Sequence, residues 1–119
     1  MSSSDAHSNA HTKRIAMTLN IKPGQIQQYI DLHAHSRPQV RNALHSVGIR
    51  NLSLWNWGDR LFYYAEYIGD EPFDQAMDRY SKMDGVSDWE QLMHKYQQKL
   101  PGSEGHVWWQ PCQLVYYQA

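Results

Sequence analysis

Residues 49–68 read IRNLSLWNWGDRLFYYAEYI, two runs rich in aromatic and aliphatic side chains that are separated by Gly58-Asp59. A two-residue connection containing glycine between such runs is typical of a β-hairpin. We therefore expect antiparallel strands over residues 49–57 and 60–68. Trp55 and Trp57 alternate onto one face of the first of these strands, and we expect them to fill an interface.

A strand and a broken helix are expected on the N-terminal side of this hairpin. Residues 14–20 alternate apolar and polar side chains before a Pro-Gly turn, which predicts a strand. A helical period follows from Gln25, is interrupted at Pro38, and ends at Gly48, in the position of a C-terminal cap. Ser36 and Gln39 fit a capping box that restarts the helix around the proline.

Two further helical segments and a last strand are expected on the C-terminal side. Residues 72–83 and 87–98 repeat their apolar side chains at helical spacing. Residues 107–117 have the composition of a strand that is interrupted by Pro111. The order β-α-β-β-α-β is that of a ferredoxin-like α+β fold, in which one face of an antiparallel sheet carries the helices.

The face of the sheet without helices needs a cover, because it carries a large share of the five tryptophans and eight tyrosines. A homodimer in which two sheets pack face to face is the economical solution. We therefore expect a homodimer. In the last strand, Trp108 and Trp109 point to opposite faces, so that only one of them can line a given pocket.

Length and composition limit the classes of protein to which the chain can belong. Its 119 residues suffice for one domain, which we place at 14–119, after a polar, disordered tail at 1–13. A net charge of −1 argues against a nucleic-acid binder. There is no apolar run long enough for a membrane helix, and the single cysteine, Cys112, cannot form an intramolecular disulfide, so we expect a cytoplasmic protein.

Tyr29 and His33 are the first candidates for a functional site, because they stand one helical turn apart on the first helix. A phenol and an imidazole that titrates near neutrality can bind and protonate hydroxyl groups, and the many aromatic side chains can offer flat faces to a sugar. The combination indicates a sugar pocket. His94 and His106 lack the spacing of metal ligands, so we expect no metal.

These residues carry a resemblance to a known family. Tyr29-x-x-x-His33 followed by Pro38, the strand pair at 50–55 and 61–67, the late Trp89 and the closing Trp108-Trp109 together resemble the L-rhamnose mutarotase family. The resemblance covers the chain from about residue 14 to the C-terminus. It implies a dimeric α+β barrel that needs no cofactor.

The resemblance also implies an activity, the interconversion of the α and β anomers of a 6-deoxyhexose, as in an aldose 1-epimerase. The family roles would fall on Tyr29 and His33 in the sugar site, with His33 as acid/base, and on Trp89 as a stacking platform. Rhamnose-specific members carry a tryptophan before the proline and a tandem tryptophan in the late helix, whereas this chain has Arg37 and Asp88-Trp89. Other segments look closer to an L-fucose branch, so both sugars are candidates.

Mutarotation needs a proton delivered to the ring oxygen and one removed from the anomeric hydroxyl, followed by the reverse after rotation about the C1–C2 bond. His33 can serve in either protonation state near neutral pH. Arg37 is a candidate to bind sugar hydroxyls. Glu66, a charged residue in an apolar strand, is a candidate for a second acid/base group or an outward-facing side chain.

Two other functions fit the same residues. The dimeric α+β barrel also hosts cofactor-free cyclases and oxygenases that act on aromatic or polyketide substrates with histidine and tyrosine acid/base groups. A non-catalytic sugar-binding module is the other possibility, and in that case His33 would have no chemical task.

Overall fold

The computed structural model describes residues 12–35 and 37–119. The predicted tail lies mostly outside this range, as does Ser36 of the predicted capping box, and Lys13 already belongs to the first strand. The strands are β1 (Lys13–Ile21), β2 (Ile49–Trp57), β3 (Arg60–Tyr67), β4 (Gln97–Gln98) and β5 (Gln110–Pro111). The helices are α2 (Ile26–Ala34), α3 (Pro38–Ser46), α4 (Phe73–Ser81) and α5 (Val86–His94).

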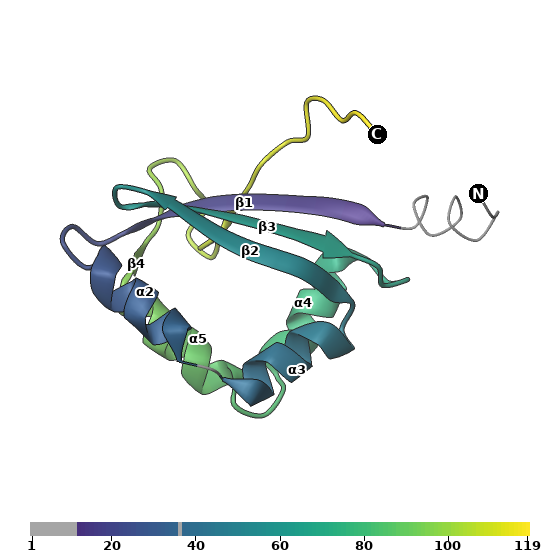
Figure 1. Ribbon diagram of the computed structural model, residues 1–119, viewed down its shortest axis with the longest axis horizontal. Coiled ribbons are helices and arrows are strands. Elements are labelled where there is room, and N and C mark those ends of the chain that lie inside the picture. Colours follow the sequence, from purple (N-terminus) through teal and green to yellow (C-terminus); the bar gives the residue numbers. More distant parts are fainter. Residues whose placement is uncertain (1–11, 36) are drawn as a thin grey trace.

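The strands form one antiparallel sheet in the order β2-β3-β1-β4, with β5 pairing the other part of β1. All four described helices lie on one face of this sheet, and the C-terminal segment leaves on the other side (Figure 1). The predicted α+β fold with a ferredoxin-like arrangement is thus confirmed. The core lies between the sheet and the helices, and its fully buried side chains include Leu19, Ile21, Tyr67 and Val86.

The hairpin is as predicted except for a bulge in β2. The register of β2 against β3 shifts between Arg50 and Ser53, and Asn51 there adopts a φ of 52°. An extra residue in one strand reverses the faces of the side chains that follow it. Leu52 and Leu54 consequently face the helices, whereas Trp55 points away from them.

The break in the first helical segment occurs where the sequence predicts it. Helix α2 ends at Ala34 and α3 begins at Pro38, a residue tolerated in the first turn of a helix. Arg37 occupies the N-cap position of α3, where no side-chain capping bond forms. Gly48 follows this helix with a φ of 105°, a conformation that strongly favours glycine.

The predictions for the last helix and the last strand were wrong in their extents. Helix α5 ends at His94 rather than Gln98, and Gln97–Gln98 instead pairs with β1 as the short strand β4. The long final strand expected at 107–117 is reduced to Gln110–Pro111. The apolar period of α5 continues through Tyr96, and a two-residue strand has no period of its own that a sequence could reveal.

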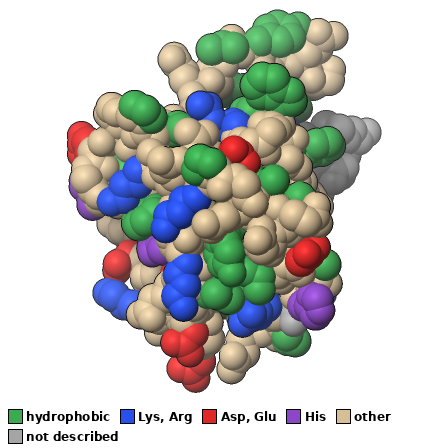
Figure 2. Space-filling view, turned by 90° about the vertical axis from the view of Figure 1, so that its left-hand side faces the viewer, with side chains coloured by type: hydrophobic (Ala, Val, Ile, Leu, Met, Phe, Trp, Pro, Cys, Tyr) green, Lys and Arg blue, Asp and Glu red, His purple; other side chains and the backbone are tan. Residues whose placement is uncertain are grey.

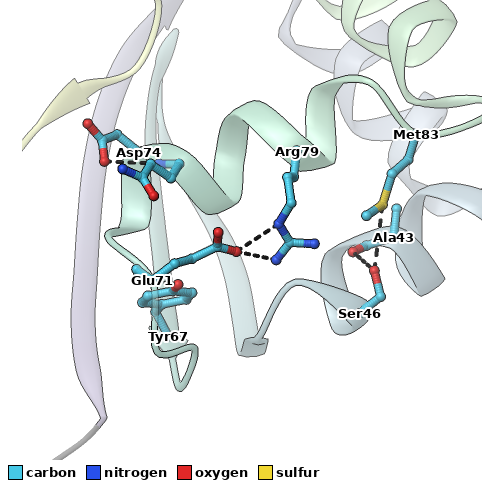
Figure 3. Close-up of polar contacts among 8 residues, drawn as sticks. Ala43, Ser46, Tyr67, Glu71, Asp74, Arg79 and Met83 are labelled. Carbon is cyan, nitrogen blue, oxygen red and sulfur yellow. Dashed lines mark hydrogen bonds and ion pairs between the residues drawn. The ribbon is translucent and has the colours of Figure 1, made fainter.

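Polar contacts fasten α3 and α4 at the end of the sheet near the C-terminus of β3 (Figure 3). The Ser46 hydroxyl donates to the carbonyl of Ala43 at 2.7 Å and lies 3.6 Å from the sulfur of Met83. The Arg79 guanidinium forms an ion pair with Glu71, whose carbonyl accepts the hydroxyl proton of Tyr67. These contacts join the end of α3 to the segment after α4, and the last turn of α4 to the segment that follows β3.

The sheet face without helices exposes large aromatic side chains. Trp55 and Trp57 are 65% and 80% exposed, and Phe62, the register partner of Trp55, is 42% exposed. Hydrophobic side chains also gather on the C-terminal segment above the sheet, at the top of Figure 2. Among the described residues, no helix is long and apolar enough to cross a membrane.

Candidate active site

A cavity of about 270 Å³ opens between the helices and the concave face of the sheet. Its volume is close to the lower end of the roughly 300–1,000 Å³ range of small-molecule sites. All four described helices contribute side chains, and β1, β2 and β3 form its floor through Met17, Leu54 and Tyr63. The cavity is therefore enclosed by apolar walls into which a few polar groups project.

Tyr29, His33 and Trp89 meet in this cavity. The rings of Tyr29 and His33 are 4.5 Å apart between centroids, as expected for residues one helical turn apart. The Trp89 ring on α5 lies edge-on to His33 with 5.0 Å between centroids. The structure thus brings together the three residues to which the family resemblance assigns the sugar site.

The hydrogen bond of His33 defines which of its two ring nitrogens carries the proton in the neutral form. Nδ1 lies 2.8 Å from the carbonyl oxygen of Tyr29. A carbonyl oxygen can only accept, so Nδ1 carries the proton and Nε2 of the neutral ring keeps a free lone pair. His33 stands at the cavity mouth, but partial removal of water by its surroundings lowers its pKa and favours the neutral form.

Arg37 lies beside the same group of residues although it belongs to neither helix. Its guanidinium carbon is 4.7 Å from the centroid of the Trp89 ring, within the range of a cation–π contact. Arg37, Arg41 and the exposed His35 all line the cavity. The structure therefore places Arg37 at the cavity, next to Trp89.

Gln97 completes the wall next to Tyr29. Its side-chain amide donates to the Tyr29 hydroxyl over 3.0 Å, and burial is the main reason that the pKa of Tyr29 rises to about 12. The phenol therefore stays protonated and can still donate its own hydrogen. The Gln97 Oε1 atom is buried and has no hydrogen-bond partner within residues 12–35 and 37–119.

Glu90 is the carboxylate of the cavity. Its Oε1 accepts a long hydrogen bond of 3.4 Å from the Tyr80 hydroxyl. Removal of water by burial raises the pKa of Glu90. Burial and then the charge of Glu90 raise the pKa of Tyr63 and Tyr80, so that both phenols stay neutral.

Trp109 and Trp108 make separate contacts, but neither lies in a strand, so the predicted alternation across a strand does not apply to them. The Trp109 ring packs on Tyr63 with 5.5 Å between centroids and lines the cavity. Trp108 instead stacks on His94 at 3.9 Å, beside Lys99. Of this pair, only Trp109 can contact a ligand in the cavity.

The structure does not bring Glu66 to the cavity. Glu66 lies on β3 between Ala65 and Tyr67, which are both buried against the helices, so its side chain points to the other face of the sheet. There it accepts hydrogen bonds from Asn51 at 2.8 Å and from Tyr64 at 3.4 Å. These hydrogen bonds connect Glu66 to the bulge of β2. The carboxylate that lines the cavity is that of Glu90.

Sequence reasoning missed Glu90, Tyr63, Tyr80 and Gln97 as cavity residues. Glu90 directly follows Trp89 on the helix, and a charge so close to a predicted platform residue was a usable signal. Tyr63 has the same strand parity as Leu61 and Ala65 and could have been placed on the helix side. Gln97 had no signal, because its position depends on the unexpected end of α5. No cluster of three or more potential metal ligands occurs among the described residues.

The fold and the site define a small α+β protein with a cavity between its sheet and its helices. The sequence profile of the L-rhamnose mutarotase family matches residues 14–118. The chain therefore belongs to the L-rhamnose mutarotase family, a family of isomerases.

Individual proteins are also similar to this chain. A UPF0734 protein of Dictyostelium discoideum is 34% identical, over 76% of each chain. The crystal structure of an L-rhamnose mutarotase from Formosa agariphila is similar with a TM-score of 0.69 at 21% identity, covering 90% of this chain and 99% of that one. Tetracenomycin F2 cyclase from Streptomyces glaucescens is similar with a TM-score of 0.57 at 13% identity, covering 90% and 97%. At these identities the solved structures establish the fold alone.

Proposed function

We propose that this protein is a mutarotase that interconverts the α and β anomers of a 6-deoxyhexose, either L-rhamnose or L-fucose. The observation that carries the proposal is the meeting of Tyr29, His33 and Trp89 in the cavity of a member of the mutarotase family. His33 is the acid/base group that opens and closes the sugar ring. No cofactor takes part in this scheme.

Each of the other cavity residues has a task in sugar binding. The indole of Trp89 offers an apolar face to the C–H groups of a pyranose. The Tyr29 hydroxyl, held by the Gln97 amide, donates to a sugar hydroxyl. Arg37 binds hydroxyls at the mouth. Apolar side chains such as Leu52, Leu54 and Met77 suit the methyl group of a 6-deoxy sugar.

The choice between the two sugars depends on the polar side of the cavity. L-rhamnose and L-fucose differ in the orientation of ring hydroxyls, and a site that hydrogen-bonds those groups discriminates between such isomers. Arg37 and Glu90 are the charged candidates for this discrimination.

Saturation-transfer NMR on equilibrated L-rhamnose and on L-fucose tests the proposal. We expect protein-dependent exchange between the anomer signals of one sugar, and a loss of about a hundredfold or more in His33→Ala, as positioned proton transfer contributes roughly 10²- to 10⁴-fold. His33 has an exposed side chain, so the variant should remain folded. His106→Ala, at an exposed histidine outside the cavity lining, is the matched control.

Two other outcomes would replace the proposal. Binding of a sugar without exchange would indicate a non-catalytic sugar-binding module. Failure of both sugars to bind would favour an enzyme for aromatic or polyketide substrates, as in the cyclase with a similar fold. The cytoplasmic location expected from the sequence stays a prediction.

We further propose that the exposed sheet face packs against a second copy of the chain, as in the dimeric α+β barrel. Trp55, Trp57 and Phe62 form an aromatic surface on that face. The C-terminal segment extends beyond it, with Tyr116 and Val115 exposed and the Tyr117 ring 3.8 Å from the guanidinium carbon of Arg14. A second copy would bury these apolar side chains, whereas a monomer leaves them in water.

A further inference from the structure

We propose that Glu90 is the second proton-transfer group of this site and works with His33 on opposite oxygens of the sugar. The inference rests on the proposed mutarotase function and names the residue that the reaction still requires. Ring opening adds a proton to the ring oxygen and removes a proton from the anomeric hydroxyl. A single histidine at the cavity mouth serves only one of these two oxygens.

The placement of Glu90 along the cavity is the first argument. Glu90 follows Trp89 on α5, and both side chains line the cavity. Successive helical residues point about 100° apart, so they face different neighbours. Trp89 contacts His33 on α2, whereas Glu90 reaches Tyr80 on α4. A pyranose stacked on Trp89 would therefore have His33 near one edge and Glu90 near another.

The surroundings of the Glu90 carboxylate are the second argument. Within residues 37–119 it accepts one hydrogen bond, from the Tyr80 hydroxyl, at a long 3.4 Å. The other groups close enough to respond to its charge are the phenols of Tyr63 and Tyr29. A half-buried carboxylate kept for stability alone would be expected to have tight partners, as Glu71 has in Arg79. Glu90 retains acceptor capacity toward the cavity.

Burial shifts the pKa values of Glu90 and His33 in opposite directions. Loss of water raises the pKa of Glu90 and lowers the pKa of His33, so both groups are driven toward their neutral forms. In the state of the site in which both groups are neutral, the carboxyl carries one transferable proton and His33 Nε2 has one free lone pair. Arg37 and Arg41, which also line the cavity, add positive charge at its rim, and His35 lines it as well.

The step balances with these two residues. His33 Nε2 removes the proton of the anomeric hydroxyl, the C1–O5 bond breaks as the C1=O bond forms, and Glu90 delivers its proton to O5. The open aldehyde turns about C1–C2. Glu90 then takes back the O5 proton as O5 attacks the other face of C1, and the imidazolium returns its proton to the former carbonyl oxygen. Both residues end in their starting states.

Glu90→Gln tests this role, because the amide keeps the size of the side chain and its acceptor for Tyr80 but has no acidic proton. We expect the exchange rate at saturating sugar to fall about a hundredfold, with sugar affinity changed less than about threefold. Glu104→Gln, at a carboxylate whose side chain is 80% exposed, is the matched control and should keep the wild-type rate.

The pH profile separates proton transfer from a structural role. The wild-type rate should be bell-shaped, since it falls when the pair gains a second proton at low pH and when it loses its shared proton at high pH. In Glu90→Gln the fall at high pH should disappear, while the fall at low pH remains. The pH profile of the wild type tests the inference even if Glu90→Gln does not fold. A wild-type exchange rate that stays level at high pH would overturn the inference.

The outcomes also separate this inference from the proposed function. Wild-type exchange that persists within threefold in a folded Glu90→Gln overturns the role of Glu90 and leaves the mutarotase function standing. A weaker affinity with an unchanged maximal rate does the same, because it assigns Glu90 to sugar binding. Absence of exchange in the wild type with both sugars overturns the proposed function and this inference together.

Discussion

The side-chain amide of Gln97 donates a hydrogen bond to the hydroxyl of Tyr29 across 3.0 Å, joining residues 68 positions apart in the chain. Gln97 lies on β4, where it pairs with Ile21 of β1, and Tyr29 lies on α2. Both side chains are buried, at 3% exposure each. This bond connects the short strand that closes the sheet to the helix that carries His33.

Tyr29→Phe is expected to lower the free energy of unfolding by about 1–3 kcal/mol, because it leaves the buried Nε2 of Gln97 without an acceptor. The ring and its contact with His33 are retained. Urea denaturation of wild type and variant measures the difference. Sugar affinity should fall as well, since the hydroxyl that faces the ligand is lost.

Gln97→Met provides the second side of a double-mutant cycle. In Tyr29→Phe/Gln97→Met no buried donor is left unpaired, so the double variant should be more stable than the sum of the single losses predicts. Strict additivity of the two single effects would show that the bond between these side chains contributes nothing to stability.

The elements that the sequence predicted well are those with a local pattern. The hairpin at 49–68 was found from its Gly58-Asp59 turn, and the break at Pro38 from the ring that cannot continue a helix. Tyr29 and His33 came together because a helix fixes side chains four positions apart, independently of the tertiary structure.

The parts that the sequence did not predict depend on tertiary contacts. The bulge at Asn51 reverses the direction of the β2 side chains that follow it. The side-chain amide of Asn51 donates a hydrogen bond to Glu66, which is possible only because β3 lies alongside β2. The same packing places Glu90 rather than Glu66 in the cavity. Strand β4 is two residues long and is held by β1, a partner more than 70 positions away.

Gly48→Ala tests the tight passage between α3 and β2. A Cβ at this position would lie 2.9 Å from the backbone nitrogen of Gly69 and 3.3 Å from the Tyr67 ring, and the φ of 105° is itself unfavourable for alanine. We expect a loss of at least about 1–2 kcal/mol in stability. Thermal unfolding monitored by circular dichroism measures it.

Gly105→Ala is the control for this substitution, because a Cβ there meets nothing within 4 Å. Its stability should stay within about 0.5 kcal/mol of the wild type. Equal effects of the two alanines would contradict the crowding seen at Gly48.

The proposed dimer predicts that Trp55→Ser/Phe62→Ser lowers the molar mass measured by light scattering at micromolar concentration from that of two chains to that of one. These side chains are cross-strand partners at the centre of the exposed aromatic surface. Val115→Ser changes an exposed apolar side chain outside this aromatic pair and should weaken the dimer less. A wild-type protein that is already monomeric under these conditions would argue against the second copy.

His33 should make the stability of the protein depend on pH in a defined direction. Its pKa in the folded protein is lower than the ordinary value of about 6.5. The unfolded chain therefore binds its proton first, and the free energy of unfolding should fall as the pH drops below 6.5 toward the lowered pKa. Below that pKa both states are protonated and the contribution stays constant.

His33→Gln removes this titration while keeping a polar side chain at the cavity mouth. The difference in unfolding free energy between wild type and variant should therefore change between pH 7.5 and pH 5, with the wild type losing more stability on acidification. Proton-detected titration of the His33 ring, assigned by the signal that disappears in the variant, gives the pKa directly. A folded-state pKa above 6.5 would reverse the slope and would make the imidazolium, rather than the neutral base, the resting form at the sugar.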